Sequence, residues 1–326
     1  MMRALFRAVP IPAASPPFDS VHLRVYYEAI YTGTEVENMT GILPADRAKT
    51  PWPVVLFLPA INGTPENYTW LGREIVTQGF LFATYTFIEQ AIPTVEPGLS
   101  PGLDTRVLTK DTYGSGPGAI TVGPILKELG AMNARGPLAG CLDLDRVILG
   151  GHSAGGTIAI QNANPGFFPS IAGSFAYGAH SLGSKMFGFE TGSVMPLCSA
   201  RPLLLMGGTG DGVIAKSASR YGLSQHASAT APIEKTFESL EPNGWSHLVL
   251  FEGANHFAIA HPHDETCARG FLDDAPTFDT AATRAAMRDV ILDFLAYAAR
   301  ADAPARERLA GLSSSRPQAI ARVLTR

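Results

Sequence analysis

Ser153 stands at the centre of Gly151-His152-Ser153-Ala154-Gly155, with a glycine two positions away on either side. A β-branched run typical of a buried strand precedes it, and helical spacing through Ile158 and Ile160 follows. A serine on a sharp turn between strand and helix has an exposed hydroxyl, and it needs glycines where strand and helix nearly touch. The pattern therefore predicts Ser153 as a nucleophile and the Ala154 amide, at the helix start, as an oxyanion donor.

A serine nucleophile needs a histidine base, and the chain offers eight histidines. His256 follows the predicted strand SHLVLFEGA in a loop of small residues, which suits a mobile imidazole. His180 ends the predicted strand SIAGSFAYGAH at the same edge of the sheet, and His261 comes shortly after His256. We expect His256 to be the base, with His180 and His261 as open alternatives.

The base in turn needs a carboxylate that fixes its tautomer. Asp211 follows the predicted strand RPLLLMGG in a glycine-rich turn, whose amides can hydrogen-bond a carboxylate. The alternative is a turn aspartate that caps a helix beginning near Ile214. The order Ser153, Asp211, His256, each after a separate strand, favours the catalytic interpretation. Glu252 and Asp264 are nearer to His256 in sequence, but residues adjacent along a strand point apart.

A second oxyanion donor is expected from the loop PAINGT, which follows the predicted strand WPVVLFLPA. The amide of Ile61 or Asn62 is the candidate, although Asn62-Gly63 also fits an ordinary turn. Apolar and polar side chains near the predicted site are candidates to bind substrate, with core packing as their alternative role: Asn62, Phe87, His152, Phe187 and Phe257.

The elements that must position these residues alternate between strand and helix. Strands are predicted at 52–60, 80–87, 146–149, 170–180, 201–208 and 246–254, and helices at 67–79, 120–133 and 280–300. Residues 21–43 resemble two antiparallel strands at the amino-terminal edge. The sequence thus predicts an α/β fold with a mostly parallel central sheet and helices on both faces, whose ligands bind beyond the carboxyl ends of the strands.

One domain is expected over residues 21–300, since no stretch inside it is typical of a linker. Residues 1–20 contain Pro10 and Pro12 and are predicted to form an irregular arm, and residues 301–326 a basic tail that frays. The segments 88–118 and 181–199 are predicted to form a lid or one wall of the acyl pocket.

Composition restricts the classes of function. A net charge of −4 offers no basic field for nucleic acid, and no apolar run approaches the roughly 18 residues of a membrane span. Three cysteines without metal-type spacing are most simply reduced thiols of a cytoplasmic protein, although a bridge between Cys198 and Cys267 stays open. We expect no metal and no organic cofactor, and the sequence leaves the oligomeric state open.

The motifs FLPAINGT, GGHSAGG, GGTGDGV and GANHF resemble those of the α/β-hydrolase superfamily, and the likeness extends from about Val21 to Ala299. They are most similar to the branch of dienelactone hydrolases, chlorophyllases, platelet-activating-factor acetylhydrolases and cutinase-like polyester hydrolases. The resemblance implies Ser153 as nucleophile, Asp211 as acid, His256 as base and backbone donors at Ile61 and Ala154. It also has limits, because dienelactone hydrolases carry cysteine in place of Ser153, and cutinase-like enzymes and chlorophyllases carry glycine in place of Ala60.

These observations predict a serine hydrolase that cleaves a carboxylic ester of small or medium size through an acyl-enzyme. The cysteine difference favours a general ester over a lactone. An amidase, a peptidase or an acyltransferase would use the same triad, because the triad does not specify the leaving group. In a different class, the fold could bind a small hydrophobic ligand without turnover.

Overall fold

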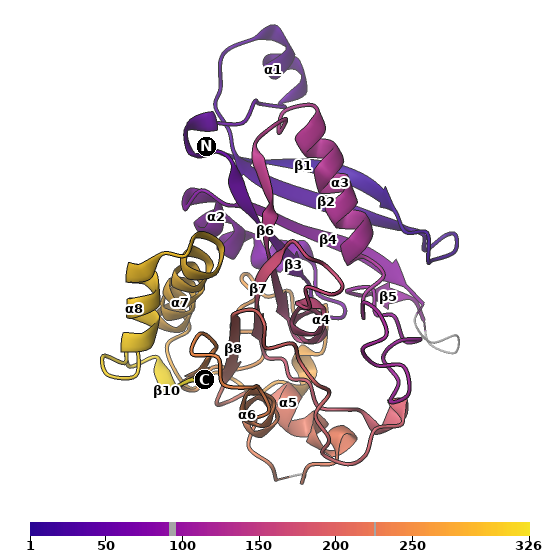
Figure 1. The fold of residues 1–326 in the computed structure, drawn as a ribbon, viewed down its shortest axis with the longest axis vertical. Coiled ribbons are helices and arrows are strands. Elements are labelled where there is room, and N and C mark those ends of the chain that lie inside the picture. The colour runs from indigo at the N-terminus through magenta and orange to yellow at the C-terminus, as the bar shows by residue number, and fades with distance from the viewer. Residues whose placement is uncertain (91–95, 225) are drawn as a thin grey trace.

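The computed structural model describes residues 1–90, 96–224 and 226–326, and its centre is a single twisted sheet (Figure 1). Within these residues the sheet has ten strands, in the order β1-β2-β4-β3-β6-β7-β8-β9-β10, with β5 paired to β4. The strands are β1 (Met2–Pro10), β2 (Ser20–Glu28), β3 (Trp52–Leu58), β4 (Leu81–Glu89), β5 (Gly98–Leu99), β6 (Leu142–His152), β7 (Ile171–Tyr177), β8 (Leu203–Gly208), β9 (His247–Phe251) and β10 (Ile320–Thr325).

The middle of the sheet is parallel and its two edges are antiparallel. β4, β3, β6, β7, β8 and β9 pair in parallel, whereas β1 and β2 add antiparallel strands at one edge and β10 at the other. The predicted fold class is confirmed by this mixed sheet. The carboxyl ends of β6, β8 and β9 all lie on one side, so the predicted nucleophile, acid and base share that edge.

Helices cover both faces because the buried strands alternate their apolar side chains between two layers. In β3, Val54, Leu56 and Leu58 pack into the core that α3 and α4 cover, while Val55 and Phe57 pack into the core under α2 and α7. The helices are α1 (Glu35–Thr40), α2 (Thr69–Thr77), α3 (Val122–Ala134), α4 (Ala154–Asn162), α5 (Gly212–Ser217), α6 (Ala231–Glu238), α7 (Thr280–Arg300) and α8 (Ala303–Gly311).

The amino terminus differs from the predicted irregular arm over residues 1–20. Residues Met2–Pro10 form β1, which pairs with β2 along its whole length, and Leu5 and Val9 are buried in the core. Pro10 is the last residue of this edge strand, where a missing amide costs no ladder hydrogen bond. The prolines therefore end the strand and do not prevent it.

Only one of the two strands predicted within residues 21–43 is present. β2 is that strand, and its antiparallel partners are β1 and β4. The predicted second strand contains the short helix α1 instead, which projects from the body of the molecule in Figure 1. Thr34 caps this helix by accepting a hydrogen bond from the Glu37 amide.

The carboxyl-terminal segment does not fray as predicted. Asp302 caps α8, whose Leu309 is fully buried, and β10 then pairs antiparallel with β9. The predicted strand 246–254 corresponds to β9, and it is followed by one more strand, β10. In Figure 1 the yellow elements α7, α8 and β10 lie together beside the sheet, so the basic tail completes both a core layer and a sheet edge.

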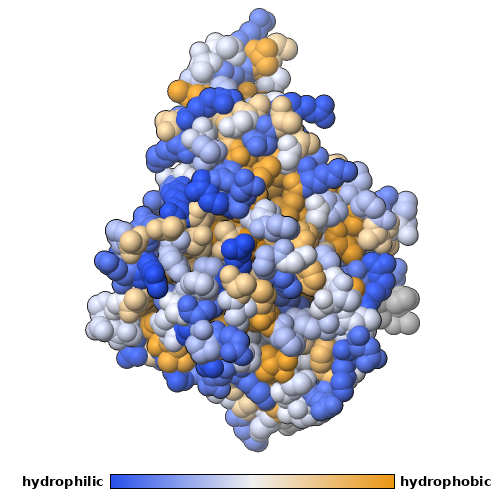
Figure 2. Space-filling view, viewed as in Figure 1, coloured by the Kyte–Doolittle hydropathy of each residue, from blue (hydrophilic) through white to orange (hydrophobic). Residues whose placement is uncertain are grey.

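Over the described residues, no helix is long and apolar enough to cross a membrane. The face shown in Figure 2 carries polar residues over most of its area, with apolar residues in separate groups among them.

Candidate active site

Ser153 sits on a strained turn between β6 and α4. Its φ of 54° and ψ of −125° are unusual for a residue with a side chain. The glycines on either side are sterically required, because a Cβ on Gly151 would lie 2.5 Å from the Gly155 carbonyl carbon, and a Cβ on Gly155 would lie 2.2 Å from the Leu58 oxygen. This geometry agrees with the turn predicted from the pentapeptide, and it leaves Ser153 only half-buried.

Asp211 and His256 form a buried hydrogen-bonded pair at the ends of β8 and β9. His256 Nδ1 lies 2.7 Å from Asp211 Oδ2, and the two side chains are 3% and 0% exposed. The other Asp211 oxygen accepts a hydrogen bond of 2.8 Å from the Ile214 amide and caps α5. Asp211 therefore has both of the partners that the sequence suggested: one oxygen binds His256 and the other caps the helix.

The backbone of Ser153 lies beside this pair, because it is bonded to Tyr177, whose neighbour Gly178 packs against His256. The Ser153 amide donates to the Tyr177 carbonyl at 2.9 Å, and a Cβ on the next residue, Gly178, would stand 3.0 Å from His256 Nδ1. In the part of the chain that the structure describes, no hydrogen bond joins the Ser153 hydroxyl to His256. Catalytic hydrogen bonds are often long before substrate binds.

The competing histidines have other partners. His180 is buried, and its Nδ1 accepts a hydrogen bond from the Leu182 amide at 3.2 Å. Burial lowers the pKa of His180 to about 4, although the nearby Asp211 charge raises it. His261 is exposed, and the ring of His263 stacks on Phe257 at 4.4 Å. Of the candidates that the sequence left open, the structure thus gives His256 the carboxylate partner.

The two amides predicted to form the oxyanion hole lie in segments that touch. The loop after β3 packs on the first turn of α4, since the Pro59 oxygen would be 2.3 Å from a Cβ on Gly155. Among the described residues, neither the Ile61 amide nor the Ala154 amide donates to another protein group. Both N–H groups are therefore free to bind an oxyanion, and Ala154 adds the positive end of the helix dipole.

Asn62 is engaged by a neighbouring loop. It has a φ of 55°, and its side-chain oxygen accepts from the Leu99 amide at 2.8 Å while its own amide donates to the Leu99 carbonyl at 2.8 Å. The sequence predicted Asn62 as a substrate-binding residue or a turn. The structure shows a turn whose side chain ties the loop after β3 to β5.

Three of the other substrate-binding candidates, Phe87, His152 and Phe257, are buried, which favours the alternative role in core packing. Phe87 is 1% exposed in the core between β4 and α3, because β4 turns that side chain toward the helices. His152 is fully buried, with both ring nitrogens bonded to protein. Phe257 is also buried, beside His256, with ring centroids 5.1 Å apart, whereas Phe187 is half-exposed.

Sequence reasoning missed Asp273, which supports both members of the pair. Its two oxygens accept from the Gly212 amide at 3.0 Å and from the Phe257 amide at 3.2 Å, the residues that follow Asp211 and His256. Burial raises the pKa of Asp273, and the nearby Asp211 charge also raises it. Its only sequence signal is a paired aspartate in a loop, FLDDAP, which is equally typical of a solvated turn.

The two segments predicted as a lid are joined to each other, although residues 91–95 of the first lie outside the described residues. Lys110 forms a 2.8 Å ion pair with Glu190, and the Tyr113 hydroxyl donates to the Pro196 carbonyl at 2.9 Å. The Lys110 amide also donates to the Phe187 carbonyl. The described parts of the two segments are thus connected to each other, and the Gly118 amide joins the first of them to Asn162 at the carboxyl end of α4.

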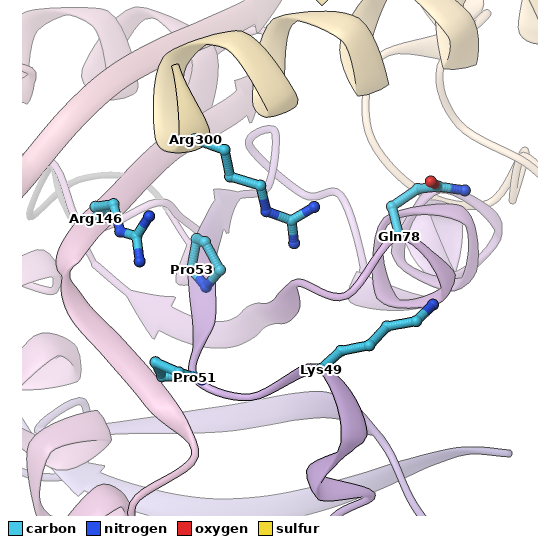
Figure 3. Close-up of a pocket in the computed structure, with 6 residues that line it drawn as sticks. All are labelled: Lys49, Pro51, Pro53, Gln78, Arg146 and Arg300. Atoms are coloured by element: carbon cyan, nitrogen blue, oxygen red, sulfur yellow. The ribbon is translucent and has the colours of Figure 1, made fainter. Parts of the chain in front are cut away.

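A cavity lies near the amino ends of β3 and β6, at the edge of the sheet opposite Ser153. It has a volume of about 390 Å³, and Figure 3 shows the three cations that line it, Lys49, Arg146 and Arg300, each on a different element. Each of them donates to a carbonyl where a helix ends, at Thr77, Ala299 and Gly79 respectively. These cations neutralise the carboxyl ends of α2 and α7, which gives them a structural role.

The three cysteines are free thiols in the structure, including Cys198 and Cys267. Within the described residues no group of three or more His, Cys, Asp or Glu is arranged to hold a metal ion.

No family model matches the sequence, and no curated protein matches it. The structure, in contrast, is similar to many solved ones. One of them is a ferulic acid esterase from Streptomyces cinnamoneus, with a TM-score of 0.55 and 15% sequence identity over 92% of this chain and 90% of that chain. Together with the mixed ten-stranded sheet covered by helices on both faces, this likeness shows that the chain has an α/β-hydrolase fold.

Proposed function

We propose that this chain is a serine hydrolase that cleaves a carboxylic ester of small or medium size through a Ser153–His256–Asp211 triad. The observation that carries the proposal is the 2.7 Å hydrogen bond between His256 and Asp211, buried beside a serine held at a φ of 54°. A buried Asp–His pair next to a strained, half-exposed serine is the arrangement that activates a hydroxyl for attack on a carbonyl.

In the proposed reaction, the Ser153 hydroxyl attacks the ester carbonyl and His256 Nε2 takes its proton. Asp211 accepts the Nδ1–H of His256, which keeps Nε2 free as a base and stabilises the imidazolium that forms. The Ile61 and Ala154 amides bind the oxyanion of the tetrahedral intermediate. His256 then returns the proton to the leaving alcohol, and water, activated in the same way, releases the acid from the acyl-enzyme.

For the substrate we propose only a class, a carboxylic ester of small or medium size, and no particular acyl group or alcohol. The solved ferulic acid esterase supports an ester substrate, and the motif likeness to dienelactone hydrolases, chlorophyllases, platelet-activating-factor acetylhydrolases and cutinase-like enzymes points the same way. The described parts of segments 88–118 and 181–199, which contact each other, would form one wall of the acyl site and limit access by a bulky polymer. We place this activity in the cytoplasm, without a metal or organic cofactor.

Hydrolysis of p-nitrophenyl esters from acetate to palmitate tests the proposal. The wild type should turn over one range of chain lengths, and Ser153→Ala should lose at least about a thousandfold in kcat/KM. Ser170→Ala serves as the control, because Ser170 is only partly buried and precedes β7 at the edge of the sheet opposite Ser153. Equal hydrolysis by wild type and Ser153→Ala would contradict the proposal. Amide and alcohol-acceptor assays with the same variants separate an ester hydrolase from an amidase or an acyltransferase.

A serine-directed phosphonate distinguishes an enzyme from a binding module on the same fold. Stoichiometric labelling of Ser153 in the wild type, absent in Ser153→Ala, is the expected result. Folded wild-type protein that resists labelling while it binds a small hydrophobic ligand would favour the binding module.

A further inference from the structure

A chain of buried hydrogen bonds connects the loop after β3 to the backbone of His256. The Ala60 amide donates to the Tyr68 hydroxyl at 3.3 Å, and that hydroxyl lies 3.0 Å from His152 Nδ1. His152 Nε2 lies 2.9 Å from the His256 carbonyl oxygen. The chain therefore begins next to the Ile61 amide, passes beside Ser153 and ends on the residue proposed as the base.

Chemistry fixes the direction of every bond in this chain. The His256 carbonyl can only accept, so His152 Nε2 carries the proton and donates. In a neutral ring His152 Nδ1 is then an acceptor, and the Tyr68 hydroxyl donates to it while accepting from the Ala60 amide. All donors and acceptors are matched in this arrangement. A second proton on His152 Nδ1 would leave the Tyr68 hydroxyl proton without its acceptor.

The surroundings also favour a neutral His152. Its side chain is fully buried, and its ring lies 4.8 Å from the His256 ring, whose positive charge appears during the proposed reaction. Burial, and then the neighbouring His256, lower the pKa of His152 well below its usual range. Burial raises the pKa of Tyr68, so that its hydroxyl keeps its proton.

Two further hydrogen bonds join the segment around Tyr68 to the segment that follows His256. Trp70 Nε1 donates to the Ile259 carbonyl at 2.8 Å, and the His261 amide donates to the Asn67 carbonyl at 2.7 Å. These bonds hold residues 67–70 against residues 256–261 from the outside. Within the described residues, only the hydrogen bonds through Tyr68 and His152 reach both the residue before Ile61 and the backbone of His256 itself.

We propose that His152 is a positioning residue that holds the oxyanion loop and the base His256 in register, an inference that rests on the proposed function. The imidazole of His152 does not touch substrate. It couples two groups that must approach the same carbonyl from different loops, and an error of about 1 Å in such placement can cost a hundredfold in rate.

Two pairs of variants test this role in the full-length protein. Tyr68→Phe removes the hydroxyl and keeps the ring, and Tyr27→Phe is its matched control, because the Tyr27 hydroxyl is equally buried and donates to the Leu43 carbonyl far from the site. We expect kcat for p-nitrophenyl acetate to fall about tenfold in Tyr68→Phe, with a smaller change in KM, and to stay within twofold in Tyr27→Phe.

At position 152, His152→Gln keeps an N–H within reach of the His256 carbonyl. His152→Leu keeps a side chain of similar volume but has no hydrogen-bond donor. His152→Gln should retain at least a tenth of wild-type kcat and His152→Leu should lose about a hundredfold. Equal kcat in the two folded variants, or in Tyr68→Phe and Tyr27→Phe, would overturn the role. The acid limb of the pH–rate profile should keep its midpoint in His152→Gln, because His152 does not titrate in the mechanism.

Nitrogen-15 NMR of the histidine side chains gives a readout that needs no activity. His152 should show a proton on Nε2 and no titration between pH 5 and pH 9; a proton on Nδ1, or titration in this range, would overturn the inference. Wild-type protein that fails to label with phosphonate would overturn the proposed function itself. Normal labelling with equal rates in Tyr68→Phe and wild type would overturn only the role of His152.

Discussion

Asp211 joins His256 to a helix start through a single carboxylate. One oxygen lies 2.7 Å from His256 Nδ1 and the other accepts from the Ile214 amide at 2.8 Å. The helix cap fixes the carboxylate in the orientation that the imidazole needs, because both oxygens are occupied and the side chain is fully buried. The same relationship allows the proposed catalytic role of Asp211 to be separated from its structural one.

Asp211→Asn should abolish most activity at little cost in stability. The Asn oxygen can still accept from the Ile214 amide, but its NH₂ group cannot accept the His256 Nδ1–H. We expect kcat to fall at least about a hundredfold while the free energy of unfolding changes by less than about 1 kcal/mol. Asp211→Ala should be as inactive and less stable by a further 1 kcal/mol or so. Urea unfolding and ester kinetics measure both quantities, and an active Asp211→Asn would exclude Asp211 as the acid.

Gly178→Ala should disturb the Asp211–His256 pair directly. The new Cβ would stand 3.0 Å from His256 Nδ1 and 3.3 Å from Asp211 Oδ2, at a φ of +59°. The matched control is Gly244→Ala, which has a φ of +74° and nothing within 4 Å of the new Cβ. Both variants should lose about 1 kcal/mol of stability from the backbone conformation. Only Gly178→Ala should also lose kcat, by tenfold or more, and equal kcat in the two variants would argue against the assigned base.

Asn62→Gly should loosen the loop that carries the Ile61 amide. Glycine tolerates the φ of 55° but lacks the side-chain oxygen that binds the Leu99 amide. We expect kcat for p-nitrophenyl acetate to fall roughly threefold to tenfold, in line with the loss of one hydrogen bond. Hydrogen exchange at Leu99 should become faster. Unchanged exchange at that amide would show that the loop is held by other contacts.

Acid should destabilise the fold through buried neutral histidines. Burial, and then Arg306, lower the pKa of His247 from 6.5 to about 4, so between these values the unfolded chain binds a proton that the folded chain does not. The stabilisation is complete above pH 6.5 and is lost as the pH falls toward 4, at about 1.4 kcal/mol per pH unit for each such histidine. His247→Gln should reduce this slope by about one proton in urea unfolding at pH 7.5, 6.0 and 5.0. An unchanged slope would contradict the assignment to His247.

Removal of residues 319–326 should destabilise the protein and promote association. The deletion removes β10 and the buried Ile320, and it leaves β9 as an unpaired hydrophobic edge strand. We expect a loss of about 3 kcal/mol in unfolding free energy, and light scattering should detect association. Removal of Arg326 alone is the comparison, because it takes away the hydrogen bonds of Arg326 to Gly244, Ser246 and Leu240 but keeps β10. Wild-type stability in the deletion variant would show that the strand is dispensable.

The amino-acid sequence by itself determined the parallel centre of the sheet and the turn at Ser153. These features follow from local patterns: continuous apolar runs for buried strands, helical spacing between them, and glycines within two residues of the serine. Since successive parallel strands end at one edge, the sequence also indicated that Ser153, Asp211 and His256 would lie on the same side.

Tertiary structure decided what depends on partners far away in the chain. β10 is a strand because β9 offers an open edge, and β1 is a strand because β2 lies beside it, although prolines and charges made both segments look irregular. Phe87 and His152 were assigned to substrate from their position in sequence, yet packing turns them into the core. Tyr68, His152 and His256 meet across 84 and 104 residues, and no local periodicity encodes such contacts.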